Sequence, residues 1–147
     1  MKNKFLVTTL LVALSVTSFA KEKNVDSRLF KDLSATLHNS PQVQWTIKDQ
    51  YKQGTFSFRD KSAAAFYSLD DNELIGFRIQ LNKNELPQIV SESIKEKYGD
   101  WQLVDAITFI DASGNVNYFT QVQKDKKSFV LKTTPNGKLS VYDRAHI

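Results

Sequence analysis

Residues 66–77 read FYSLDDNELIGF, and residues 131–142 read LKTTPNGKLSVY. Each stretch has apolar residues at both ends and turn-forming residues in the middle, which is the pattern of a β-hairpin. The two stretches align without a gap at an offset of 65 residues. The aligned apolar pairs are Phe66 with Leu131, Leu74 with Leu139, and Phe77 with Tyr142. We interpret the two stretches as the last hairpins of two tandem repeats; chance similarity of two unrelated hairpins is the alternative.

The first twenty residues have the pattern of a secretory signal peptide. The positively charged start, MKNK, precedes a twelve-residue apolar run, and Ser18 and Ala20 supply the small residues that a signal peptidase reads. The run is shorter than the roughly 20 residues of a membrane-spanning helix, although a retained anchor is the alternative. Without cysteine, the chain cannot carry a lipid anchor. We expect a periplasmic or secreted protein that begins near Lys21 and keeps no stable membrane anchor after signal cleavage.

Length and charge limit the remaining function classes. The 127 residues after the predicted signal are enough for a single domain with its own core. Without Lys2 and Lys4 the chain has 18 basic and 16 acidic residues, so it is nearly neutral, and we expect no nucleic-acid partner. The absence of cysteine excludes disulfides, thiol catalysis and thiolate metal sites. Ten Phe, five Tyr and two Trp supply a large apolar area instead.

The apolar periodicity predicts an α+β fold. A helix is expected over residues 26–38 and a second over 86–98, which Pro87 opens and Gly99 ends. The expected strands are 43–47, 56–58, 64–68, 74–81, 101–110, 118–123, 128–132 and 138–142. Two tandem repeats, about 25–82 and 83–147, would each hold one helix and about four antiparallel strands. Together they would form one domain over residues 21–147, an antiparallel sheet with the helices on one face.

The second half of the chain resembles a known group of exported proteins. Leu86-Pro87 opening a helix, Lys97-Tyr98 near its end, and the late turn Gly137-Lys138-Leu139 resemble the PepSY-like, beta-lactamase-inhibitor-like (BLIP-like) proteins of Bacteroidetes. In the first half Asn72 replaces the glycine and no Leu-Pro precedes the helix, so that repeat diverges more. The resemblance implies an antiparallel sheet of tandem repeats. Because related folds inhibit hydrolases, it also allows a role as an enzyme inhibitor, although a shared fold is not a shared function.

No catalytic constellation is visible in the sequence. The histidines, His38 and His146, lie at the end of a predicted helix and next to the C-terminus, and neither has a nucleophile at a motif spacing. HExxH, GxSxG and P-loop motifs are absent. We therefore predict no catalytic residues and no cofactor, and expect that the protein is not an enzyme.

Two acidic clusters suggest an alternative function. Asp70, Asp71 and Glu73 form one cluster, and the second contains Asp111, Ser113 and Asn115. The second cluster begins like a calcium loop but has valine at the sixth and twelfth positions, where an EF-hand needs Gly and Glu. Since Asp and Asn are also the residues that turns prefer, we interpret both clusters as turns and predict no metal site. A small-ligand or calcium-binding envelope protein that uses these turns is the alternative.

The parity of the strand residues predicts a binding surface. Because alternate side chains of a strand face opposite sides, the alignment places Phe66, Leu74 and Gly76 toward the helices. The other face, open to solvent, would carry the predicted partner-binding residues Tyr67, Ile75, Phe77, Ile79 and Tyr142. Exposed contiguous apolar area marks interaction sites, unless a neighbouring segment covers it or copies of the chain associate through it. We expect a non-enzymatic exported protein that binds a protein or peptide of the cell envelope through this face.

Overall fold

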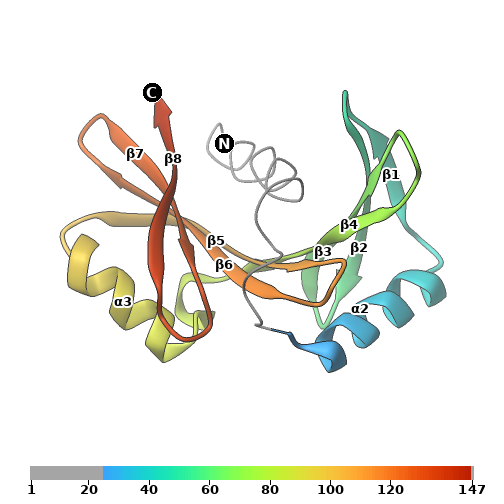
Figure 1. The fold of residues 1–147 in the computed structure, drawn as a ribbon, viewed down its shortest axis with the longest axis horizontal. Coiled ribbons are helices and arrows are strands. Elements are labelled where there is room, and N and C mark those ends of the chain that lie inside the picture. Colours follow the sequence, from blue (N-terminus) through green and yellow to red (C-terminus); the bar gives the residue numbers. More distant parts are fainter. Residues whose placement is uncertain (1–24, 147) are drawn as a thin grey trace.

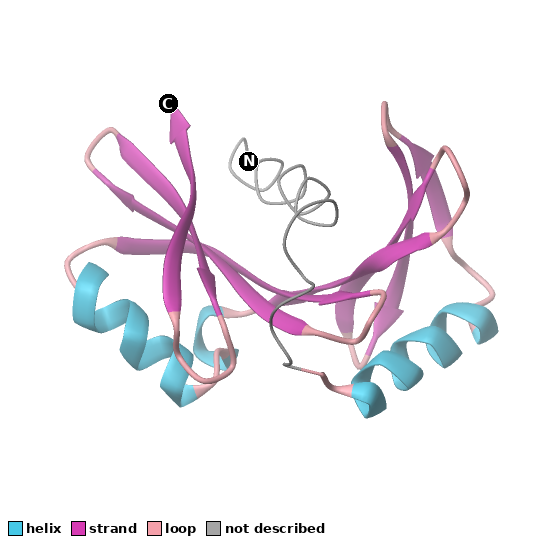
Figure 2. Ribbon diagram, viewed as in Figure 1, coloured by secondary structure: helices cyan, strands magenta, loops and turns pink. Residues whose placement is uncertain are grey.

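The computed structural model describes residues 25–146, and side chains up to residue 142. The predicted signal peptide, residues 1–20, lies outside the described residues. The elements, shown in Figures 1 and 2, are α2 (Ser27–Asn39), β1 (Gln44–Ile47), β2 (Tyr51–Phe58), β3 (Lys61–Ser68), β4 (Leu74–Leu81), the 3-10 helix η2 (Lys83–Glu85), α3 (Gln88–Tyr98), β5 (Gln102–Asp111), β6 (Val116–Lys124), β7 (Lys127–Thr133) and β8 (Leu139–His146).

The eight strands form one antiparallel sheet in chain order, from β1 at one edge to β8 at the other. The sheet bends so that its two ends rise on the side away from both helices (Figure 1). We call the face toward α2 and α3 the helix face, and the opposite one the concave face. The prediction of an α+β fold with an antiparallel sheet and both helices on one face is therefore confirmed.

Local sequence signals explain where both helices begin and end. The Asp26 carboxylate accepts a hydrogen bond of 3.0 Å from the Leu29 amide and caps the start of α2. Helix α3 follows Pro87, carries Lys95 and Lys97 in its last turn, and is followed by Gly99. These bounds lie within two residues of the predicted ones. Strand β2 begins at residue 51, five residues before its predicted start.

Two apolar clusters fill the space between the helices and the sheet. The cluster beneath α2 contains Leu33, Phe56, Phe58 and Phe77, all at most 4% exposed. The cluster beneath α3 joins Val90 and Ile94 to Val122 and Leu131 of the sheet. Burial of this apolar area against the helices supplies the main favourable free energy of folding.

The last hairpin of each half contains a β-bulge. Between β3 and β4, Phe66 pairs with Gly76 but Tyr67 pairs with Leu74, so Ile75 is the extra residue. Between β7 and β8, Val130 pairs with Asp143 but Leu131 pairs with Val141, so Tyr142 is the extra residue. Each bulge shifts the register and therefore changes which residues share a face.

Candidate interaction surface on the concave face

The five residues predicted to share an open face lie on two different faces. Tyr67, Phe77 and Ile79 belong to the cluster on the helix face, beneath α2. The ring of Phe77 lies 5.5 Å from that of Phe30, between centroids, and is 1% exposed. Ile75 and Tyr142 are half-buried and pack against the cluster on the concave face. The prediction of one shared surface is therefore wrong.

The bulges and the position of α2 explain this error. The constant offset of 65 pairs Phe66 with Leu131, yet Phe66 lies on the concave face and Leu131 beneath α3. Both faces of β3 are apolar, because Ala63 and Ala65 face α2 while Phe66 lies on the concave side. Alternation along β3 alone therefore could not tell which set of side chains the helix covers.

The concave face carries its own apolar cluster. The cluster combines large side chains from β2, β3, β5, β6 and β7 with Ile75 and Tyr142 from the bulges. Its rings lie in two groups, with centroid distances of 5.5 Å for Tyr51–Phe66 and 6.4 Å for Phe66–Phe109 in one, and 5.6 Å for Phe119–Tyr142 in the other. Its members are Tyr51, Ala64, Phe66, Ile107, Phe109, Phe119 and Val130. No helix within residues 25–146 lies over this cluster (Figure 1).

Polar side chains lie among these rings in rows that cross the strands. Arg78 and Asn117 are the cross-strand neighbours of Phe109 on either side, so all three share the concave face. In the next row toward the β6–β7 turn, Ile107 and Phe119 lie between Gln80 and Lys132. The concave side of the sheet therefore combines buried aromatic rings with amide and cationic side chains.

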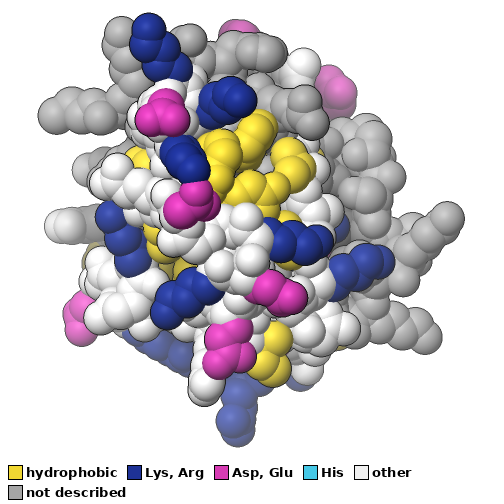
Figure 3. Space-filling view, turned by 90° about the vertical axis from the view of Figure 1, so that its left-hand side faces the viewer, with side chains coloured by type: hydrophobic (Ala, Val, Ile, Leu, Met, Phe, Trp, Pro, Cys, Tyr) yellow, Lys and Arg dark blue, Asp and Glu magenta, His cyan; other side chains and the backbone are white. Residues whose placement is uncertain are grey.

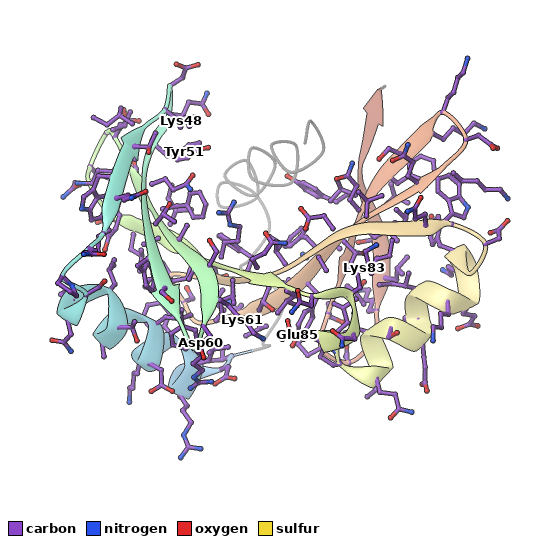
Figure 4. The ribbon with its side chains drawn as sticks, turned by 180° about the vertical axis from the view of Figure 1, so that it is seen from behind. Lys48, Tyr51, Asp60, Lys61, Lys83 and Glu85 are labelled. Atoms are coloured by element: carbon purple, nitrogen blue, oxygen red, sulfur yellow. The ribbon has the colours of Figure 1, made fainter. Side chains whose placement is uncertain are left out.

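Burial shapes the electrostatics of Arg78. Desolvation lowers the pKa of its guanidinium, while Asp105 and then Tyr51 act to raise it. The guanidinium lies 5.7 Å from the ring centroid of Phe66, which is cation–π distance. Burial likewise raises the pKa of Tyr51, and the positive charge of Arg78 lowers that pKa by a smaller amount. Figure 4 shows Tyr51 on the inner side of β2.

Two amides of β6 were not singled out by the sequence analysis. The side chain of Asn117 is 0% exposed, and neither its Oδ1 nor its Nδ2 atom has a hydrogen-bond partner. Gln121 is also 0% exposed; its Nε2 donates to Ser128 Oγ at 3.0 Å, while its Oε1 has no partner. The polar residues at alternate positions on either side of Phe119 are the signal that could have identified them.

The acidic clusters are turns, as predicted, and the fold brings them side by side. The Asp111 carboxylate accepts hydrogen bonds from the Ser113 amide at 2.8 Å and the Asn115 amide at 3.0 Å. Asp71 accepts from the Glu73 amide at 3.1 Å, and this bond is the main cause of the lowered pKa of Asp71. The two turns line a cavity of about 230 Å³. Within residues 25–146 no group of three metal-ligating side chains is found.

A second cavity of about 230 Å³ opens on the helix face, between α2 and η2. Its walls include Phe58, Ile79 and Tyr118, and burial raises the pKa of Tyr118, with Asp26 adding a smaller effect. Lys61 Nζ and a carboxylate oxygen of Glu85, two residues of its lining, lie 2.9 Å apart. Both residues are labelled in Figure 4. Because this ion pair already satisfies both charges, the cavity shows no preference for a charged ligand.

Aromatic side chains at the end of the molecule that holds α3 form a local cluster. Figure 3 faces this end and shows hydrophobic side chains gathered between charged ones. Trp101 lies 4.9 Å from Phe129 and 5.6 Å from Tyr98, between ring centroids. At the opposite edge Trp45 is 51% exposed and its ring covers Gly54, where a Cβ atom would clash with it. Both arrangements are explained by packing between neighbouring elements.

The histidines lie where the sequence analysis placed them. His38 is exposed in the last turn of α2, and its Nδ1 atom lies 2.7 Å from the Ser34 carbonyl oxygen. His146, which is described by its backbone alone, is the last residue of β8. His38 therefore has the role of a residue at a helix end.

Solved structures with the same fold come from Bacteroides. A BLIP-like protein from Bacteroides fragilis has a TM-score of 0.65 at 15% identity, covering 86% of this chain and 89% of that one. A protein from Bacteroides eggerthii, provisionally described as periplasmic, has a TM-score of 0.64 at 14% identity, covering 85% and 91%. A DUF2874 family protein from Bacteroides uniformis has a TM-score of 0.64 at 11% identity, covering 78% and 86%.

These similarities establish the fold of the chain. It is that of BLIP-like proteins, so the resemblance seen in the sequence is confirmed at the level of the fold. No protein-family model and no curated protein matches the chain. Neither helix in the described part is long and apolar enough to span a membrane. The expectation of a periplasmic or secreted protein agrees with the description of the Bacteroides eggerthii neighbour.

Proposed function

We propose that this chain is a non-enzymatic, exported binding protein whose concave face holds a protein partner. One observation carries the proposal: a cluster of aromatic and aliphatic side chains occupies the sheet face on which no helix of residues 25–146 lies. The seven central members of this cluster are at most 7% exposed, and Ile75 and Tyr142 at its margin are half-buried and form its accessible part. Inhibition of an enzyme is one form that such binding can take.

The extent of the surface favours a macromolecular partner over a small molecule. The cluster takes side chains from β2 through β8, so an occupant must span most of the width of the sheet. Aromatic side chains dominate the binding energy of many protein interfaces, and Tyr142 is the half-buried aromatic residue at the margin of this cluster. The curvature favours a convex or projecting part of the partner.

The structure changes the set of residues proposed for binding. Ile75 and Tyr142 remain candidates because they are half-buried on the concave face. Phe77 and Ile79 pack beneath α2 and belong to the core, and Tyr67 is a partly buried residue that packs against the same cluster on the helix face. This revision determines which variants can test binding without unfolding the protein.

A crosslinking pull-down from the native cell envelope tests the proposal, with residues 21–147 as bait. The test variant is Ile75→Ser/Tyr142→Ser, and the matched control is Ile89→Ser/Val141→Ser, which removes apolar residues that are 54% and 44% exposed. Ile89 lies on α3, and Val141 shares the helix face with Leu131. We expect one protein to be captured by the wild type and the control and lost by the test variant. Equal capture by all three folded proteins would contradict the proposal.

We also propose that the two halves are copies of one unit. The order of one helix and four strands occurs twice, and the last hairpin of each half carries a bulge at Ile75 or Tyr142. Matching the bulges aligns Phe66 with Val130, both on the concave face, at an offset of 64 residues, and Ile75 with Tyr142 at an offset of 67. The second hairpin continues its pairing for longer beyond the bulge, to Thr133 and Leu139, and this insertion explains the change of offset, which a gapless alignment cannot accommodate.

A further inference from the structure

We infer that β1 is a self-association edge, through which two copies of this chain join their sheets. Strand β1 of one copy would pair with β1 of the other in antiparallel orientation, around a two-fold axis near Thr46. The two eight-stranded sheets would then be continuous, with both concave faces on the same side. This inference goes beyond the proposed function, because it uses an edge of the sheet and leaves the concave face free for a partner.

The outer edge of β1 carries unpaired backbone groups. The Lys48 N–H donates to the Tyr51 carbonyl oxygen at 2.8 Å, so these two residues form a hydrogen-bonded pair at the end of the β1–β2 hairpin. Because such pairs alternate along an antiparallel ladder, the backbone N–H and C=O groups of Trp45 and Ile47 point away from β2. No strand of residues 25–146 pairs with them, since β1 is at the edge of the sheet order.

The side chains that accompany these backbone groups are apolar and exposed. Trp45 is 51% exposed and Ile47 is 73% exposed. The Trp45 ring lies 5.8 Å from the Tyr67 ring, between centroids, which places Trp45 and Ile47 on the helix face of the sheet. An edge strand that is exposed, apolar and uncharged is a template for pairing with another chain.

The two edges of the sheet differ in the features that prevent such pairing. Charged side chains and β-bulges on an edge strand oppose the addition of another strand. Strand β8 has both, namely the bulge at Tyr142 and the charged residues Asp143 and Arg144. Strand β1 reads QWTI, has no charged residue, and pairs with β2 without a register shift. We therefore expect association at β1 and not at β8.

The sequence of β1 complements itself in one register, which favours a second copy as the occupant. When Trp45 of each copy lies opposite Ile47 of the other, all outward backbone groups of both residues are paired, in about four hydrogen bonds. This register sets an aromatic side chain against a β-branched one, and Thr46 against Thr46, and both kinds of pair are favourable. Lys48 lies opposite Gln44, so like charges do not meet. The two-fold contact closes after two copies.

The size of this contact predicts a weak dimer. Strand β1 contains four residues, Gln44–Ile47, whereas a standard stable interface takes about 20–30 residues from each side. Dimerisation should therefore depend on protein concentration, and a covalent trap is needed to define the register.

Sedimentation velocity of residues 21–147, from about 10 μM to about 1 mM, measures the association across the range of a weak contact. We expect a monomer at the lowest concentration and a dimer at the highest. Ile47→Pro should weaken the dimer about tenfold or more, because each copy loses one outward N–H donor while its bonds to β2 remain. The control Ile89→Ser, which removes an isoleucine that is 54% exposed on α3, should associate like the wild type. Circular dichroism verifies that both variants are folded.

Disulfide cross-linking tests the register, because the chain has no cysteine. The inferred register makes the two Thr46 residues a non-hydrogen-bonded pair, with Cα atoms about 4.5 Å apart, a separation that a disulfide spans. Gln44 is also exposed and shares a face of β1 with Thr46, but it would lie roughly 14 Å from its counterpart. Mild oxidation should therefore yield a linked dimer from Thr46→Cys and none from Gln44→Cys.

Three results would overturn the inference: a monomer at the highest concentration, an Ile47→Pro variant that dimerises like the wild type, or equal cross-linking of the two cysteine variants. A monomer that captures an envelope protein and loses it on Ile47→Pro substitution would assign the edge to a strand of that protein, which would also overturn it. These outcomes are separable from failure of the proposed function, because Ile75→Ser/Tyr142→Ser should dimerise like the wild type.

Discussion

Replacing Phe77 by alanine is expected to lower the free energy of unfolding by about 3–5 kcal/mol. The side chain is 1% exposed, and its ring lies 5.5 Å from that of Phe30 and 6.4 Å from that of Phe56. The variant loses the transfer free energy of the ring, leaves a cavity, and breaks two edge-to-face contacts that each contribute about 0.5–1.5 kcal/mol. For a domain of this size the melting temperature should fall by about 12–20 °C.

Urea unfolding of residues 21–147, followed by circular dichroism, measures this change. The control is Ile47→Ala on edge strand β1, where the side chain is 73% exposed and a change below about 0.5 kcal/mol is expected. A loss below about 1 kcal/mol for Phe77→Ala, or equal losses for both variants, would refute the assignment of Phe77 to the core. Such a result would restore the sequence-based prediction that Phe77 lies on an open face.

Three further changes test the energetics of the fold. Asn117→Leu should raise the free energy of unfolding by about 1–3 kcal/mol, because it removes a buried unpaired amide. Asn115→Leu should lower the free energy of unfolding by a similar amount, because Asn115 Nδ2 donates to the Asp111 carboxylate. A decrease in stability for both variants in thermal melts would contradict this reasoning. Gly76→Ala should cost at least about 1–3 kcal/mol in the same assay, since a Cβ atom would collide with a backbone carbonyl oxygen of β5; wild-type stability would refute the contact. The hydrogen bond from the Asn82 backbone N–H is the main cause of the lowered pKa of the Glu85 carboxyl. The ionised Glu85 therefore stabilises the fold at neutral pH, and this contribution is lost as the pH falls below about 4. Melting temperatures measured from pH 7 to 3 should fall less steeply for Glu85→Gln than for the wild type, and parallel curves would exclude the effect.

The helices could be predicted because their signals are local. Asp26 caps α2, and Leu33 and Leu37 recur at helical spacing on its buried side. Pro87 and Gly99 bound α3 in the same way. Capping and turn formation depend on residues a few positions apart, so a linear pattern is enough to identify them.

The candidate site could be predicted only in part. The sequence indicated a binding surface on the sheet, and Ile75 and Tyr142 do lie at the concave cluster. Asn117 and Gln121 escaped notice because an amide in a strand is unremarkable until its partners are known. The hydrogen-bond deficit of a side chain is a property of three-dimensional surroundings that no spacing rule expresses.

The sequence by itself determined the α+β class, the alternation of helices and strands, the turns and the pattern of an export signal. These depend on composition and on contacts within a few residues. Only the tertiary structure decided which face of β3 the helix covers, because both faces of that strand are apolar and the choice depends on where α2 packs. Because Ile75 is an extra residue in β4, each residue that follows it points to the opposite side of the sheet from the one that strict alternation predicts. Because side chains alternate with a period of two, a register shift of one residue exchanges core and surface.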